Sequence, residues 1–375
     1  MHCFFRAFVC TLALLPSIPA GAQSVAQGPA ATAGSISLPV VVRDNKGALV
    51  TTLKPSDVSL SVDNQPLKLS GFSIQSGQPF LLGLLVQTTH GMEGARADVK
   101  AAAAKFIDQM LLGSNQGGTK PSEAFLIHFD RDVELLSDFT AKPADIHREL
   151  DTLGPTQITR HDRAPGPDDE GGQVSTGANV GGFSGTRTSN TLYDAIFLAA
   201  DELMKTRDGR KALIIFSDGV DRGSKENLTD AIEAADRANL TLYTIFFRGE
   251  EARQGFNGLP GQNNGHHGGI GFPGGWPGGG GSHPGGSNEP KPAIDGKKIM
   301  QQLADRTGGS YFEVKKKDSL SEAFAGIATE LNAQYLLTFT PEKPDPDGGY
   351  HKITLKTSDT SLKLQTREGY YAPTQ

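Results

Sequence analysis

Two apolar runs in this chain end abruptly in polar residues that could bind a ligand. The first, Phe80–Met92, leads into Gln87–Gly91, and the second, Lys211–Asp221, leads into Asp218. These polar residues offer an amide, hydroxyls, an imidazole and a carboxylate. Runs this apolar are typical of parallel strands buried on both faces. Because ligands of open α/β sheets bind outside the carboxyl ends of the strands, we expect a ligand-binding edge there.

The same residues resemble the ligand-binding motif of von Willebrand factor A domains, in which one strand ends in Asp-x-Ser-x-Ser and a later strand ends in Ser-Asp-Gly. The sequence LYDAI at 192–196 and the tail GYYAP at 369–373 are similar to an exported subfamily known from acidobacteria. The resemblance covers nearly all of residues 36–373. It implies a non-enzymatic module that binds a protein partner through the carboxyl edge of an α/β sheet.

The resemblance also implies a metal site, some of whose ligands are replaced in this chain. Gln87 stands where the family has Asp, Thr89 keeps a hydroxyl in place of the first Ser, and Gly91 replaces the second Ser. Asp218 is the retained acid. Magnesium prefers near-octahedral oxygen ligands and usually needs at least one carboxylate. We therefore expect no tightly bound cofactor, and only weak binding of Mg²⁺ or Mn²⁺ through Thr89 and Asp218.

The family's threonine before the helix falls at Asn190, although a one-residue shift would bring in Ser189 or Thr191 instead. The predicted ligand-binding face therefore consists of Gln87, Thr88, Thr89, His90, Gly91, Asn190 and Asp218. Asp194 lies in the first turn of the same predicted helix. A carboxylate there is favoured by the helix dipole and the free amides, so we expect it to cap the helix.

Histidines offer two further kinds of site. His90 has no serine or acid partner at a recognisable spacing, so an exposed loop residue is favoured over a catalytic base. His266, His267 and His283 lie in a tract rich in glycine and proline. Imidazole is the commonest transition-metal ligand, but this tract has no carboxylate or cysteine at a fixed spacing. We expect no tight metal site there.

Enzyme motifs are absent from the sequence. A dinucleotide site needs G-x-G-x-x-G after the first strand, and Val86–Gly94 does not supply it. A P-loop is also missing, as is the Gly-x-Ser-x-Gly elbow of hydrolases. The leading hypothesis is a protein-binding module. The alternatives are a cation-dependent adhesion receptor, a secreted α/β hydrolase, and a scaffold that makes its contact through the glycine-rich tract.

The amino terminus predicts export. Arg6 precedes an apolar stretch at 7–15, and small residues follow at Ala20-Gly21-Ala22, as in a signal peptide. That stretch is shorter than the roughly 20 residues of a membrane span. We expect cleavage after Ala22, a periplasmic or extracellular location, and no transmembrane span afterwards.

The positions of the cysteines and the net charge limit which kinds of site and partner we expect. Both cysteines, Cys3 and Cys10, fall in the predicted signal peptide, so the mature chain would have neither disulfides nor thiolate chemistry. The formal net charge of −6 gives no indication of a nucleic-acid partner.

Hydrophobic periodicity predicts the architecture. Period-two alternation at 36–75 and 334–371 indicates antiparallel strands, which we expect to form one β-sandwich from both chain ends. Between them, at 78–333, strands alternate with helices. The predicted strands are 79–87, 123–130, 132–137, 211–217, 240–247 and 309–314. The fold class is therefore α/β, with a doubly wound, mostly parallel six-stranded sheet inserted in a small antiparallel sandwich. We expect a disordered leader at 23–35 and flexible loops at 154–188 and 254–292.

Overall fold

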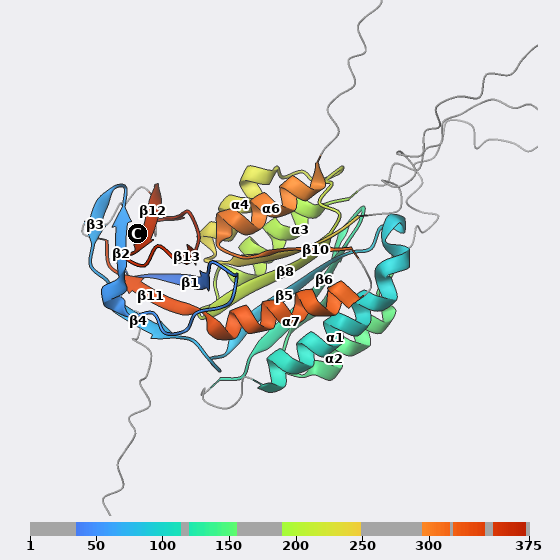
Figure 1. Cartoon of the computed structure of the whole chain (residues 1–375). Coiled ribbons are helices and arrows are strands. Elements are labelled where there is room, and N and C mark those ends of the chain that lie inside the picture. Colours follow the sequence, from blue (N-terminus) through green and yellow to red (C-terminus); the bar gives the residue numbers. More distant parts are fainter. Residues whose placement is uncertain are drawn as a thin grey trace, which may run out of the picture.

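The computed structural model describes residues 35–113, 120–155, 190–248, 295–315, 318–341 and 348–372. A six-stranded sheet with helices on both faces occupies the centre, and two four-stranded antiparallel sheets lie at one end of it (Figure 1). The predicted signal peptide at 1–22 lies outside the described residues. So do the leader at 23–35 apart from its last residue, the loop at 154–188 apart from its first two residues, and the loop at 254–292.

The large sheet has the strand order β10-β9-β8-β5-β6-β7, and all neighbours are parallel except β6 and β7. Its strands are β5 (Phe80–Gln87), β6 (Glu123–Phe129), β7 (Val133–Thr140), β8 (Arg210–Ser217), β9 (Thr241–Phe247) and β10 (Tyr311–Val314). Nearly all side chains of β5 and β8 are buried, as expected of strands covered on both faces. The predicted six-stranded, mostly parallel sheet is confirmed.

Helices cover the sheet in two layers (Figure 1). One face packs against α1 (Arg96–Gly113), α2 (Pro143–Thr152) and α7 (Asp318–Ala333). The other packs against α3 (Leu192–Phe197), the π-helical η4 (Leu198–Met204), α4 (Leu228–Arg237) and α6 (Gly296–Thr307). None of the described helices is both long and apolar enough to cross a membrane.

The π-helical turn changes which residue of the third helical segment reaches the core. A regular α-helical period predicts Leu203 on the buried side with Ala199. Instead Met204 is fully buried and Leu203 is only partly buried. A π-helical turn joins residues five apart, so it moves the buried position one residue further along the chain.

Strands from both chain ends form the sandwich. One sheet has the order β13-β1-β11-β4 and the other β14-β12-β2-β3. The strands are β1 (Ile36–Asp44), β2 (Val58–Val62), β3 (Gln65–Leu67), β4 (Gly71–Ile74), β11 (Tyr335–Phe339), β12 (Tyr350–Thr357), β13 (Leu362–Gln365) and β14 (Gly369–Tyr371). Strand β1 pairs with both β11 and β13, and β2 pairs with β12. The two ends therefore share one sheet system and one core, as predicted. Two 3₁₀ turns complete the described fold, η1 (Pro55–Asp57) and η2 (His90–Ala95).

Candidate functional site

The side-chain amide of Gln87 bridges the ends of the two central strands. Strands β5 and β8 are neighbours, so Gln87 and Ser217 end side by side. The Gln87 Oε1 atom accepts hydrogen bonds from Ser217 Oγ at 2.7 Å and from the backbone N–H of Asp218 at 3.0 Å. Its Nε2 donates to Thr89 Oγ1 at 2.8 Å. Gln87 is 3% exposed, and its buried amide therefore joins the two loops within the protein.

Asn190 is the second bridge at this edge. Its Nδ2 donates to the carbonyl of Val220 at 2.7 Å and lies 3.4 Å from Asp218 Oδ1. Asp218 Oδ1 also accepts the N–H of Val220 at 3.0 Å. The Thr191 hydroxyl instead donates to the backbone carbonyl of Asp130 at 3.2 Å. Of Asn190 and Thr191, Asn190 is thus the residue that reaches Asp218, and Ser189 lies outside the described residues.

Thr88 belongs to a buried network that the sequence analysis did not detect. The Thr88 hydroxyl lies 3.2 Å from His128 Nδ1, and His128 Nε2 lies 2.6 Å from Glu134 Oε2. The order of groups is that of a nucleophile, a base and an acid. However, Thr88 is 1% exposed, whereas the Glu134 side chain is 62% exposed. The hydroxyl end is therefore closed to a substrate, and the network holds the Thr88 backbone against β6 and β7.

Two carboxylates pin the loop after β8 to the start of α3. Asp221 accepts the N–H of Tyr193 at 3.1 Å and the hydroxyl of Ser224 at 2.5 Å. Asp194 accepts the N–H groups of Lys225 and Glu226 at 2.9 Å each. The predicted helix-capping role of Asp194 therefore needs correction. The free N–H of Tyr193, in the first turn of α3, donates to Asp221. The Asp194 carboxylate instead accepts N–H groups from the loop after β8.

A close backbone approach joins this loop to α6. Gly219 has a φ of +71°, and a Cβ atom added to it would lie 2.1 Å from the carbonyl oxygen of Gly296. Only glycine satisfies both conditions without strain. The same loop also contacts Asn190, whose Nδ2 donates to the carbonyl of Val220 at 2.7 Å. The loop after β8 is therefore in contact with both Asn190 and the first residue of α6.

The seven residues of the predicted ligand-binding face differ in how far their side chains are exposed to solvent. The buried members are Gln87, Thr88, Thr89 and Asn190. His90 is exposed at the start of η2, while Gly91 and Asp218 are partly exposed. The part that a partner can touch is therefore smaller than the predicted face. The exposed Arg222, whose N–H donates to the carbonyl of Asn190, lies beside it and was missed by the sequence analysis.

The donor set at this edge fits a divalent cation poorly. Asp218 brings the one carboxylate among the predicted ligands, and Thr89 Oγ1 already accepts a hydrogen bond from Gln87. Among the described residues, no group of three or more His, Cys, Asp or Glu side chains is placed to hold a metal. One feature points the other way. The buried Asn190 Oδ1 has no hydrogen-bond partner within the described part of the chain.

Comparisons with known proteins give distant likenesses of fold. No protein-family model and no curated protein matches the chain. Proximal thread matrix protein 1 from the mussel byssus, with a zinc-occupied MIDAS motif, matches at 11% identity and a TM-score of 0.43, over 72% of this chain and 50% of its own. The von Willebrand factor type A protein from Catenulispora acidiphila matches at 10% identity and a TM-score of 0.42, over 93% and 74%.

A third likeness is to the vWF domain of the type V pili tip protein Mfa5 from Porphyromonas gingivalis. It has 12% identity and a TM-score of 0.40, over 68% of this chain and 95% of the other. The present chain spans about half the length of the mussel protein. At these identities the likenesses assign neither a partner nor a cofactor to this chain.

Proposed function

We propose that this chain is an exported, non-enzymatic module of the von Willebrand factor A type that binds a protein partner at the carboxyl edge of its large sheet. The observation that carries the proposal is the Gln87 amide. Its oxygen and nitrogen are both engaged by Ser217, Asp218 and Thr89 of the same chain. These internal hydrogen bonds hold the ends of the two strands in one arrangement.

The surface offered to the partner is built from few side chains on a rigid support. His90 is exposed, Asp218 is partly exposed, and Arg222 lies beside them. Two buried residues support this surface. Gln87 accepts a hydrogen bond from Ser217, and Asn190 donates one to the carbonyl of Val220. A preorganised surface loses little conformational freedom on binding, which favours affinity for a protein ligand.

A cation-dependent adhesion receptor is the second candidate. It is favoured by the buried Asn190 Oδ1, which lacks a partner among the described residues and belongs to the residue beside Asp218. Thr89, Asn190 and Asp218 would hold Mg²⁺ or Mn²⁺, which would supply a positive charge to bind an acidic group of the partner. With a single carboxylate, we infer weak binding.

A secreted hydrolase receives no support from the described residues. A chain of contacts joins the Thr88 hydroxyl to the His128 imidazole and the imidazole to the Glu134 carboxylate. However, the Thr88 hydroxyl is buried and cannot reach a substrate. The scaffold hypothesis depends on the tract at 254–292, which lies outside the described residues.

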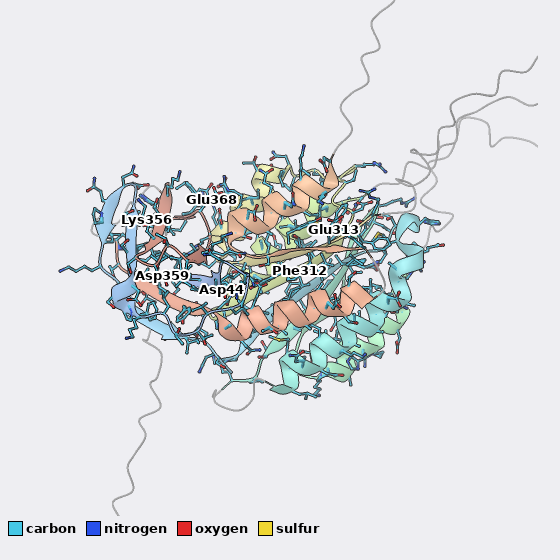
Figure 2. The ribbon with its side chains drawn as sticks, in the orientation of Figure 1. Asp44, Phe312, Glu313, Lys356, Asp359 and Glu368 are labelled. Atoms are coloured by element: carbon cyan, nitrogen blue, oxygen red, sulfur yellow. The ribbon has the colours of Figure 1, made fainter. Side chains whose placement is uncertain are left out.

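Affinity capture from an envelope extract, followed by binding measurements with the purified partner, tests the proposal. We expect His90→Ala to weaken binding and chelation of divalent cations to leave it unchanged. Lys356→Ala is the control, because Lys356 is exposed on the sandwich, at the far end of the molecule (Figure 2). Equal affinity of the two variants would contradict a binding surface at this edge. Loss of binding on chelation would favour the cation-dependent receptor.

A further inference from the structure

A cavity of about 380 Å³ lies where the sandwich meets the large sheet. Its walls come from β1, β13, α6, α7 and the start of β10. Because β10 begins there, the cavity lies at the amino edge of the sheet, opposite the Gln87 and Asp218 edge. Figure 2 shows Phe312 of the cavity wall on β10, between α6 and α7, with Asp44 of β1 on the sandwich side. Ligand pockets commonly have volumes of about 300–1,000 Å³ and often lie between domains.

One wall of the cavity is a preorganised polar cluster. The Glu330 side chain is 3% exposed, forms an ion pair with Arg43, and accepts a hydrogen bond of 2.6 Å from Ser310 Oγ. The Gln365 amide donates to Ser310 Oγ at 3.1 Å and to the carbonyl of Gly309. These contacts tie α7 to β1 and β13, so the polar wall is assembled from both parts of the molecule.

The remaining walls offer unused polar groups and an aromatic ring. Within the described part of the chain, the side chains of Gln301 and Asp305 on α6 have no hydrogen-bond partner, and both line the cavity. Opposite them, the half-buried Phe312 ring rests on α7 at Gly326, where a Cβ would approach the ring to 3.0 Å. The cavity lining therefore combines hydrogen-bond acceptors and donors with an aromatic ring.

We propose that this cavity binds a neutral carbohydrate of one or two sugar units. Amides and carboxylates hydrogen-bond to pairs of neighbouring hydroxyls, and an aromatic ring packs on the apolar C–H face of a sugar. The lining holds one guanidinium against two carboxylates, so an anionic ligand is disfavoured. Burial raises the pKa of Glu330 and of Asp305, because negative charge is poorly solvated at these positions, and the same cost applies to an anionic ligand.

Calorimetric titration of the purified chain with glucose, maltose and cellobiose, and with glucose 6-phosphate for comparison, tests this inference. We expect saturable binding of at least one neutral sugar and weaker binding of the phosphorylated one. Saturable binding of none of the neutral sugars, or tighter binding of the anionic sugar, would overturn the proposal.

Matched variants on α6 locate the binding site. Gln301→Ala removes an amide from the cavity wall, whereas Gln302→Ala changes its exposed neighbour, which does not line the cavity. Loss of one neutral hydrogen bond should weaken sugar binding by about threefold to tenfold for Gln301→Ala. The affinity of Gln302→Ala should stay unchanged, and the melting temperatures of both should match the parent chain. Equal sugar affinities in the two variants would overturn the assignment to this cavity.

Discussion

The guanidinium of Arg210 donates a hydrogen bond of 2.7 Å to the backbone carbonyl of Gln75, where the chain passes from the sandwich into the large sheet. The same guanidinium donates to the carbonyl of Leu331 at 2.5 Å and to Gln334 Oε1 at 3.1 Å, where the chain returns. Its Cζ atom lies 3.7 Å from the centre of the Phe80 ring. One side chain therefore fastens both crossings between the two parts of the molecule.

We expect Arg210→Ala to lower the free energy of unfolding by about 3 kcal/mol or more, because it leaves several acceptors without donors at the junction. Arg131→Ala is the control, since Arg131 is exposed and its replacement should cost less than about 0.5 kcal/mol. Denaturant unfolding monitored by circular dichroism measures both. Equal stabilities would show that solvent replaces the contacts of Arg210.

Gly219→Ala should destabilise the loop after β8. The added Cβ would meet the carbonyl oxygen of Gly296 at 2.1 Å, and the φ of +71° is strained for alanine. Gly47→Ala is a matched control, because Gly47 has a φ of +84° with nothing within 4 Å of an added Cβ. We expect a loss of about 1 kcal/mol for Gly47→Ala, and roughly 2–3 kcal/mol more for Gly219→Ala. Similar losses in the two melting curves would contradict a close approach of the loop to α6.

Asp236 makes stability depend on pH. Burial raises its pKa to about 7, opposed by Arg367 and Arg306, with Glu368 and Glu233 raising it further. Its Oδ1 has no hydrogen-bond partner among the described residues. Because the folded-state pKa is above the unfolded value, the folded chain binds the proton more tightly. The resulting stabilisation is complete below about pH 4 and is lost as the pH rises to about 7.

We therefore expect Asp236→Asn to have little effect at pH 4 and to stabilise the chain at pH 8, by on the order of 3 kcal/mol. The control is Asp132→Asn, which changes an exposed carboxylate. Its stability relative to the parent chain should be the same at both pH values. Unfolding curves at the two pH values test this, and a stabilisation by Asp236→Asn that does not change with pH would contradict it.

Divalent cations should bind the unmodified chain weakly. Titrating Mg²⁺ or Mn²⁺ by calorimetry should give no saturable binding below about millimolar concentrations. The double variant Gln87→Asp and Gly91→Ser adds a carboxylate and a hydroxyl, and it should gain binding that Asp218→Ala then removes. Tight binding by the unmodified chain, abolished by Asp218→Ala, would reverse the order of the two proposed functions.

The amino-acid sequence by itself determined the order and type of the main elements. The run Phe80–Gln87 is apolar at nearly every position and short, as expected of a strand covered on both faces. Alternation at Ile36–Asp44 and Tyr350–Thr357 indicated the sandwich strands for the same local reason. The position of Gln87 and Asp218 at one edge also followed, because parallel strands place their carboxyl ends together.

Only the tertiary structure decided which polar atoms meet. Gln87 and Ser217 are 130 residues apart in the sequence, yet their side chains form a hydrogen bond. His128 reaches Thr88 across a strand pair in the same way. Local patterns report whether a side chain faces a core, because burial depends on periodicity along one element. Hydrogen-bond partners depend instead on strand order, strand register and side-chain length. The local sequence pattern does not contain these, so only the tertiary structure determines the partners.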